Sequence, residues 1–161
     1  MGAGASRAQS DALVFFGATG DLAYEQVFPA LYAMAKRGVL NVPVVGVAHS
    51  GWALAELRKR AQDSITNAGG IDNKRAFKHL MSLMRYVDGD YKNEATFVAL
   101  KKALRPARRP AHYLAIPPTL FGTVVKALRK SGLAEGGRVI IEKPFGHDLA
   151  SARALNRVAT S

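Results

Sequence analysis

The stretch that decides the fold reads LVFFGATGDLA and covers residues 13–23. Its first four residues are apolar, and a short apolar run that ends at a glycine predicts a strand buried on both faces in a parallel sheet. From Asp21 onward apolar residues recur at helical spacing, so a helix is expected next. We expect Pro29 to kink this helix and Gly38 to end it.

The rest of the chain alternates between strand and helix patterns. Further strands are expected at residues 42–48, 85–87, 112–116 and 138–141. Helices are expected to begin at residues 51–52 and end at residues 67–70, and to cover residues 73–84, 93–104, 119–130 and 148–158, with a basic, proline-broken loop at residues 105–110. This order predicts an α/β fold, a doubly wound parallel sheet of the Rossmann type. We expect one domain over residues 11–161, preceded by a flexible leader at residues 1–10.

Composition excludes several classes of protein. The 161 residues are 48% hydrophobic, which suits a single globular domain, and no apolar run is long enough to span a bilayer. The first residues match a myristoylation pattern but lack the basic cluster that firm anchoring needs, so no membrane partner is expected. The chain has no cysteine, which fits a reducing compartment and predicts a cytoplasmic protein.

The formal net charge of +11 raises nucleic acid as a partner, because clustered Lys and Arg neutralise backbone phosphates. Here the basic residues are spread over several segments and fall mostly on polar helix faces. We therefore interpret them as a solvated surface and predict no nucleic-acid partner.

The turn after the first strand has the residues that a pyrophosphate site needs. Gly17 permits a tight turn, Gly20 allows phosphates to approach the backbone, and the small Ala23 allows the helix to pack against the strand. The predicted coenzyme-binding residues of this turn are Gly17, Ala18, Thr19, Gly20, Asp21 and Leu22. Glycines also end strands for steric reasons alone, and Thr19 and Asp21 would then be only helix caps.

Three motifs together give the chain a family resemblance. These are GATGDLA at residues 17–23, YLAIPP at residues 113–118 and EKPFGHDL at residues 142–149, and the segment RYVDGDY at residues 85–91 fits as well. From about residue 11 to residue 156 the sequence resembles the glucose-6-phosphate dehydrogenases. The resemblance implies an NADP-binding domain of an enzyme that oxidises glucose 6-phosphate to 6-phosphoglucono-1,5-lactone, the first step of the pentose phosphate pathway. It also implies a homo-oligomer for the full-length enzyme.

The resemblance assigns further residues to the site. Lys143 matches the lysine that binds the hexose phosphate near the coenzyme, and the backbone of Ala115, Ile116 and Pro117 is expected to lie against the coenzyme. A lysine just past the carboxyl end of a parallel strand also lies, on physical grounds, where open sheets bind ligands. The alternative is a solvated lysine before the turn-forming Pro144.

Coenzyme choice in this fold is decided beyond the second strand, where the chain reads Ala48, His49 and Ser50. There is no carboxylate here to repel a 2′-phosphate, but the family's usual arginine is replaced by His49, and its lysine-rich run is replaced by YEQ at residues 24–26. We expect His49 and Ser50 to contact NADP, with NAD also possible. Because histidine gains charge toward pH 6, NADP should be favoured more at pH 6 than at pH 8.

The family takes its catalytic His-Asp pair from a second domain, so no catalytic residue is expected in this chain and the isolated chain is expected to be inactive and monomeric. The histidines at positions 79, 112 and 147 lack metal-ligand spacing, and no metal site is expected. Two alternatives stay open. One is a sugar oxidoreductase of the Gfo/Idh/MocA type, and the other is a non-catalytic basic module that binds nucleotides or nucleic acid.

Overall fold

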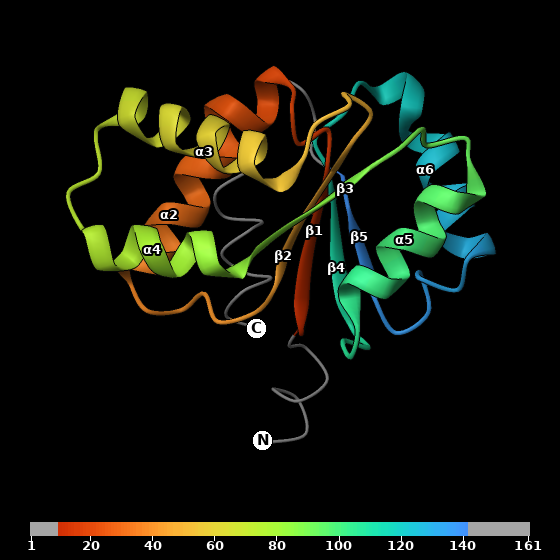
Figure 1. The fold of residues 1–161 in the computed structure, drawn as a ribbon. Coiled ribbons are helices and arrows are strands. Elements are labelled where there is room, and N and C mark those ends of the chain that lie inside the picture. The colour runs from red at the N-terminus through yellow and green to blue at the C-terminus, as the bar shows by residue number, and fades with distance from the viewer. Residues whose placement is uncertain (1–9, 142–161) are drawn as a thin grey trace.

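The computed structural model describes residues 10–141 as a parallel sheet between two helical layers (Figure 1). Five strands pair in the order β3-β2-β1-β4-β5, and every described pairing is parallel. Their bounds are β1 Ala12–Phe16, β2 Val44–Ala48, β3 Met84–Asp88, β4 Pro110–Leu114 and β5 Arg138–Ile140. This order is that of the Rossmann fold, so the predicted fold class is confirmed.

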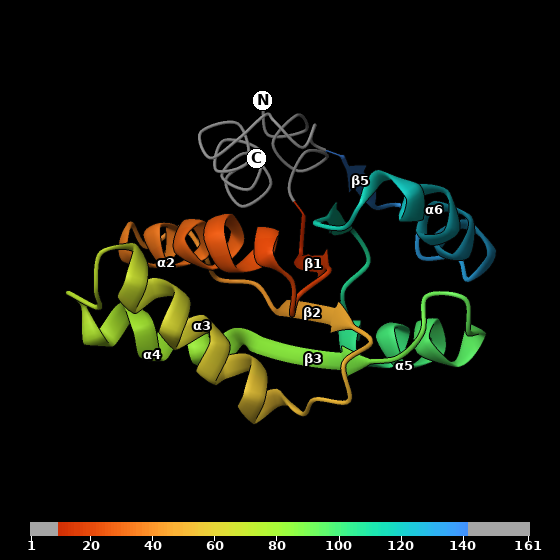
Figure 2. The same ribbon diagram turned by 90° about the horizontal axis from the view of Figure 1, so that it is seen from above.

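Helices on the two faces complete the layers. Figure 2 shows η1, α2, α3 and α4 on one side of the sheet and α5, η2 and α6 on the other. Their bounds are η1 Ala23–Val27, α2 Phe28–Lys36, α3 Leu54–Ala68, α4 Lys74–Leu83, α5 Glu94–Leu104, η2 Pro118–Leu120 and α6 Phe121–Lys130. Residues 1–9 of the expected leader, the expected helix at residues 148–158 and Lys143 lie outside the described residues.

The side chains of β1 divide between two cores because successive residues of a strand point to opposite faces. Leu13 and Phe15 pack into the core under α2, α3 and α4, while Val14 and Phe16 pack into the core under α5 and α6. All five residues of β1 are buried. The two-sided burial predicted from the apolar run is therefore confirmed.

The first helix is irregular next to Pro29, where a kink was expected. It contains a wide π-helical turn, η1, in which Phe28 N–H donates to Ala23 O five residues back. Pro29 follows directly after this turn, near the start of α2. Gly38, with φ of +75°, lies just past the last helical residue, as predicted.

The expected fourth strand is shifted along the chain. Residues 112–116 were predicted, but β4 covers Pro110–Leu114, and Pro110 opens the strand instead of belonging to the preceding loop. The register explains the shift, because Phe16 pairs with Leu114 and the chain of β1 then turns away at Gly17. Ala115 and Ile116 therefore follow the end of the strand, and both remain buried.

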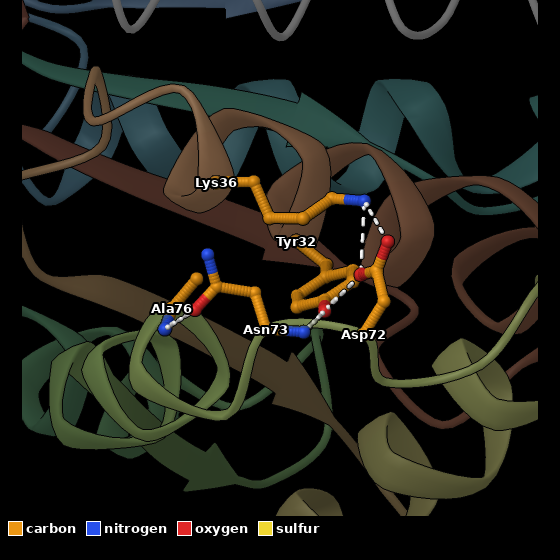
Figure 3. Close-up of polar contacts among 5 residues, drawn as sticks. All are labelled: Tyr32, Lys36, Asp72, Asn73 and Ala76. Atoms are coloured by element: carbon orange, nitrogen blue, oxygen red, sulfur yellow. Dashed lines mark hydrogen bonds and ion pairs between the residues drawn. The ribbon is translucent and has the colours of Figure 1, made fainter.

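A polar cluster fixes α2 to the segment before α4 (Figure 3). The hydroxyl of Tyr32 donates to Asp72 Oδ1 at 2.6 Å and accepts the N–H of Asn73 at 2.8 Å, while Lys36 Nζ lies 3.2 Å from the same carboxylate. Burial raises the pKa of Tyr32, and the hydrogen bond from Tyr32 lowers the pKa of Asp72. Asn73 in turn accepts the N–H of Ala76 and caps α4. We interpret this cluster as structural.

Candidate functional site

The candidate site lies at the carboxyl edge of the sheet, the upper edge in Figure 1, onto which Figure 2 looks. Since β2 and β4 flank β1, the turns that follow these three strands meet at this edge. Gly17 N–H donates to Val47 O at 2.9 Å, and Ala115 N–H donates to Phe16 O at 3.0 Å, so both neighbouring turns are tied to the first one. In open α/β sheets this reversal of strand order is where ligands bind.

Gly17 is required by space as well as by backbone conformation. Its φ is +82°, and a Cβ added there would lie 2.1 Å from Ala115 O and 2.9 Å from Ile116 Cγ2. No side chain fits at this point. The structure thus brings together the glycine turn and the segment that the family resemblance assigned to the coenzyme.

The first turn of the following helix offers amide donors. Gly20 N–H donates to Gly17 O at 3.0 Å, which closes the turn, and Tyr24 N–H donates to Gly20 O at 3.1 Å. The amides of Asp21 and Leu22 therefore precede the first helical hydrogen bond. Amides at a helix N-terminus, with the positive end of the helix dipole, suit an anion such as a pyrophosphate.

A cation that sequence reasoning missed lies beside this turn. Arg60 of α3 places Nη2 3.4 Å from Gly20 O and 3.8 Å from Asp21 Oδ1, and its guanidinium lies 4.5 Å from the centre of the Tyr24 ring. Three residues before it, the buried Leu57 lies on the same helix face. That spacing was the signal in the sequence.

The turn after β2 holds both of its predicted residues. His49 and Ser50 are exposed, and Ser50 Oγ lies 2.7 Å from Thr19 Oγ1, so the two turns touch. Asp88, at the end of β3, supports this turn by accepting the N–H groups of Ser50 and Gly51, each at 2.9 Å. Its segment was noted as familial in the sequence, but Asp88 received no role.

Asp88 is held as a carboxylate by its donors. The hydroxyl of Tyr86 donates to Asp88 Oδ1 at 2.5 Å, and this bond, with the backbone N–H bonds, keeps the pKa of Asp88 below its usual range. Burial and the adjoining carboxylate raise the pKa of Tyr86, so the phenol stays protonated. The group at the end of β3 is thus a fixed anion.

Tyr91 was also missed, and it braces the glycine turn from the side of α5. Its hydroxyl accepts the N–H of Gly17 at 2.8 Å and donates to Val47 O at 3.2 Å. The ring packs edge-on against Phe16, with 5.7 Å between ring centres. Tyr91 therefore connects the ends of β1 and β2 to the start of α5.

A hollow of about 720 Å³ lies between α5 and α6. Its floor includes Phe97 and Val98, and its rim carries basic residues that looked scattered in the sequence: Lys92, Lys101, Lys102, Arg105, Lys126 and Lys130. One of them is neutralised, since Lys130 Nζ lies 3.1 Å from Glu94 Oε2. The hollow shares Tyr91 with the glycine turn but contains none of the predicted coenzyme residues.

The described residues hold no candidate for a metal centre or for a membrane span. Within residues 10–141 no three acidic or histidine side chains gather closely enough to hold a metal ion. In the same range no helix combines the length and apolar character that crossing a membrane requires.

Comparison with known proteins points to one family. Residues 14–161 match the family model described as "Glucose-6-phosphate dehydrogenase, NAD binding domain". Glucose-6-phosphate 1-dehydrogenase 1 of Mycobacterium tuberculosis is 42% identical over 147 residues, which cover 91% of this chain and 31% of that protein. The yeast Saccharomyces cerevisiae enzyme of the same name is 35% identical, over 88% of this chain and 31% of its own length.

Solved structures agree. The crystal structure of glucose-6-phosphate 1-dehydrogenase from Mycobacterium avium superposes with a TM-score of 0.79 at 41% identity, over 92% of this chain and 33% of that one. A glucose-6-phosphate dehydrogenase in complex with its substrate gives 0.74 at 30% identity, over 94% of this chain and 34% of that one. The chain spans about a third of the length of these relatives. It belongs to the family of the NAD-binding domain of glucose-6-phosphate dehydrogenase.

Proposed function

We propose that this chain is the coenzyme-binding part of an enzyme that oxidises glucose 6-phosphate to 6-phosphoglucono-1,5-lactone and passes the hydride to NADP. The observation that carries the proposal is the glycine turn at residues 17–22. There Gly17 lies against Ala115 and Ile116 with no room for a side chain, and the amides of a helix N-terminus lie free beside it. The family match favours this function over the Gfo/Idh/MocA and nucleic-acid alternatives.

Each of the three turns receives one part of the coenzyme. The amides of Thr19, Asp21 and Leu22 hold the pyrophosphate, because helix N-terminal amides bind phosphate, whereas Ala18 N–H and Gly20 N–H already donate to backbone oxygens. The turn at residues 48–50 takes the adenosine ribose, which lies beyond the second strand in this fold. The backbone of Ala115, Ile116 and Pro117 lies along the nicotinamide half. The contact between Thr19 and Ser50 supports this reading, since it joins the first two turns into one surface.

Discrimination between NADP and NAD is relaxed in this chain. The turn after β2 offers the exposed His49 where an arginine would hold a 2′-phosphate through two parallel hydrogen bonds. A neutral imidazole adds little attraction for a phosphate, whereas a protonated one attracts it. NADP and NAD therefore both bind, and NADP gains relative affinity as the pH falls from 8 to 6.

The substrate contact and the chemistry require more than the coenzyme turns. Lys143, which lies outside the described residues, is proposed to bind the phosphate-bearing sugar beside the nicotinamide. The chain supplies no proposed general base, and removal of the hydroxyl proton needs one. The 161-residue chain therefore binds coenzyme without turnover. We further propose that it is cytoplasmic, monomeric when isolated and part of a homo-oligomer in the full-length enzyme.

Two measurements on the isolated chain test the proposal. Calorimetric titration should show NADP and NAD binding to one site per chain, and a spectrophotometric assay with glucose 6-phosphate should show no enzyme-like rate. Absence of binding by either coenzyme would contradict the assignment of the glycine turn. An enzyme-like rate would contradict the assignment of the chemistry to residues outside this chain.

A further inference from the structure

The turn between β2 and α3 has its own anions in place. Two successive backbone donors, Ser50 N–H and Gly51 N–H, converge on the single oxygen Asp88 Oδ1 at 2.9 Å each. Two residues further on, Ala53 N–H donates to Glu56 Oε1 at 2.7 Å. Consecutive amides that point to one place form a cup that suits an anion. In this protein the side chain of Asp88 fills that cup.

The position of this cup gives it consequences for the coenzyme. It lies in the turn after the second strand, which in the Rossmann fold faces the adenosine ribose and its 2′ substituent. A 2′-phosphate that approached this turn would find the two amides already engaged. It would also meet the negative charge of Asp88, and like charges a few ångströms apart repel each other.

Nothing positive within the turn offsets this charge. Residues 48–53 contain no lysine or arginine, and their one titratable group is His49. The nearby Arg60 is directed to Gly20 and Asp21 of the glycine turn and lies over the ring of Tyr24. The hydroxyl of Ser50, which could have donated to a phosphate, lies 2.7 Å from the Thr19 hydroxyl instead.

We propose that Asp88 is a specificity-determining residue, whose carboxylate occupies the amide cup of the β2–α3 turn and disfavours a coenzyme that carries a 2′-phosphate. The proposal rests on the proposed function, because it assumes that the adenosine ribose lies at this turn. It goes beyond the relaxed discrimination proposed above, because it predicts that NAD binds at least as tightly as NADP at pH 8. The carboxylate belongs to the end of β3, so it does not show in the sequence of the turn after β2.

A purely structural role for Asp88 predicts something different. If the carboxylate only shaped the turn, its removal would weaken both coenzymes by the same factor. Asp88→Asn separates the two roles, because the amide oxygen of asparagine can still accept the N–H groups of Ser50 and Gly51 while the charge is lost. The matched control is Asp90→Asn, two residues away, whose carboxylate accepts Lys92 N–H outside the cup.

The test compares two pairs of ligands that differ only in the 2′-phosphate: NADP with NAD, and adenosine 2′,5′-bisphosphate with AMP. We expect the parent at pH 8 to bind the unphosphorylated member of each pair at least as tightly. Asp88→Asn should shift both ratios toward the phosphorylated member by roughly tenfold, the size expected for one removed charge near a phosphate in a largely aqueous setting. Asp90→Asn should leave both ratios within about twofold of the parent, because solvent screens a more distant charge.

Three outcomes would overturn the proposal. The first is a parent that already selects NADP tenfold or more, a result that does not depend on the folding of any variant. The second is an equal loss of affinity for both members of each pair in Asp88→Asn, which would leave Asp88 only a structural role. The third is failure of the parent to bind any of the four ligands, which would remove the proposed function itself and is thereby distinguished from the other two.

Discussion

The turns after β1 and β2 lie side by side but differ in whether their backbone amides are free to bind an anion. In the first, residues 17–22 place helix N-terminal amides ahead of the first helical hydrogen bond and carry no carboxylate acceptor for them. In the second, the amides of Ser50 and Gly51 are already bound to Asp88, and the amide of Ala53 is bound to Glu56. An anion site therefore depends on whether the protein's own acidic side chains already accept hydrogen bonds from the backbone donors. The first turn is ready for a phosphate and the second is already neutralised.

The largest expected effect comes from adding a methyl group at Gly17 of the first turn. Gly17→Ala would place Cβ 2.1 Å from Ala115 O in a backbone with φ of +82°, so the chain must move. We expect the free energy of unfolding to fall by about 3 kcal/mol or more. Affinity for NAD and NADP should fall together by more than tenfold. Chemical denaturation and coenzyme titration measure the two effects.

Gly38→Ala is the matched control for that substitution. Gly38 has a similar φ of +75°, but an added Cβ there meets nothing within 4 Å. It should cost about 1 kcal/mol of backbone strain and leave coenzyme affinity unchanged. Equal effects of the two substitutions would show that close packing against Ala115 does not matter.

The next largest effect is a loss of stability in acid, which must be known before selectivities at different pH values are compared. Burial lowers the pKa of His112 to about 4, from an ordinary value of 6.5. Between these values the unfolded chain takes up a proton and the folded one does not, so stability falls as the pH decreases from about 6.5 to 4. The full loss is about 3 kcal/mol.

Urea unfolding at a series of pH values checks this, with His112→Leu as the variant in which the slope should flatten. His79→Gln, at an exposed histidine of α4, should keep the slope. A parent whose stability does not change between pH 6.5 and 4 would show that His112 is protonated in the fold.

The sequence predicts the first turn better than the second. The first turn is encoded locally: an apolar strand, two glycines at fixed spacing and a helix pattern predict it, and Gly17, Ala115 and Ile116 meet at the expected edge. The second turn depends on contacts between residues far apart in the chain. Asp88 lies 38 residues from Ser50, and no local pattern indicates that its carboxylate reaches that amide.

Contacts between distant parts of the chain also explain the other features that the sequence did not predict. Tyr91 reaches Gly17 across 74 residues, and the basic rim of the α5–α6 hollow forms only when two helices pack together. The strand β4 is shifted because β1 ends before Gly17. The pairing of β1 with β4 therefore stops at Phe16 and Leu114. Pro110 looked like a loop residue because proline is excluded from strand interiors, yet it is allowed as the first residue of a strand.

A smaller effect is expected from removing the brace of the first turn. Tyr91→Phe deletes the hydroxyl that accepts Gly17 N–H and donates to Val47 O, while Gly17 N–H keeps its bond to Val47 O. We expect a loss of about 1 kcal/mol of stability. Affinity should fall a few-fold and equally for NAD and NADP, as titrations of both would show. A change in the ratio of the two affinities would mean that Tyr91 also acts on the second turn.

The smallest expected effect is a change in coenzyme selectivity at His49 of the second turn. His49→Arg should move the NADP to NAD affinity ratio about fivefold toward NADP, because an exposed guanidinium beside a phosphate gains about 1 kcal/mol. His79→Arg on α4 is the control with equal added charge. A ratio unchanged by His49→Arg would point to another cation, with Arg60 the first to test.

Amide NMR can show directly whether the turn at residues 17–22 binds the coenzyme pyrophosphate. In a titration of the ¹⁵N-labelled chain with NAD, the largest chemical-shift changes should fall on the amides of residues 18–22, with a second group at Ala115 and Ile116. Inorganic pyrophosphate should shift the first group and spare the second. Shifts confined to the lysine-rimmed hollow between α5 and α6, with residues 18–22 unmoved, would contradict the account.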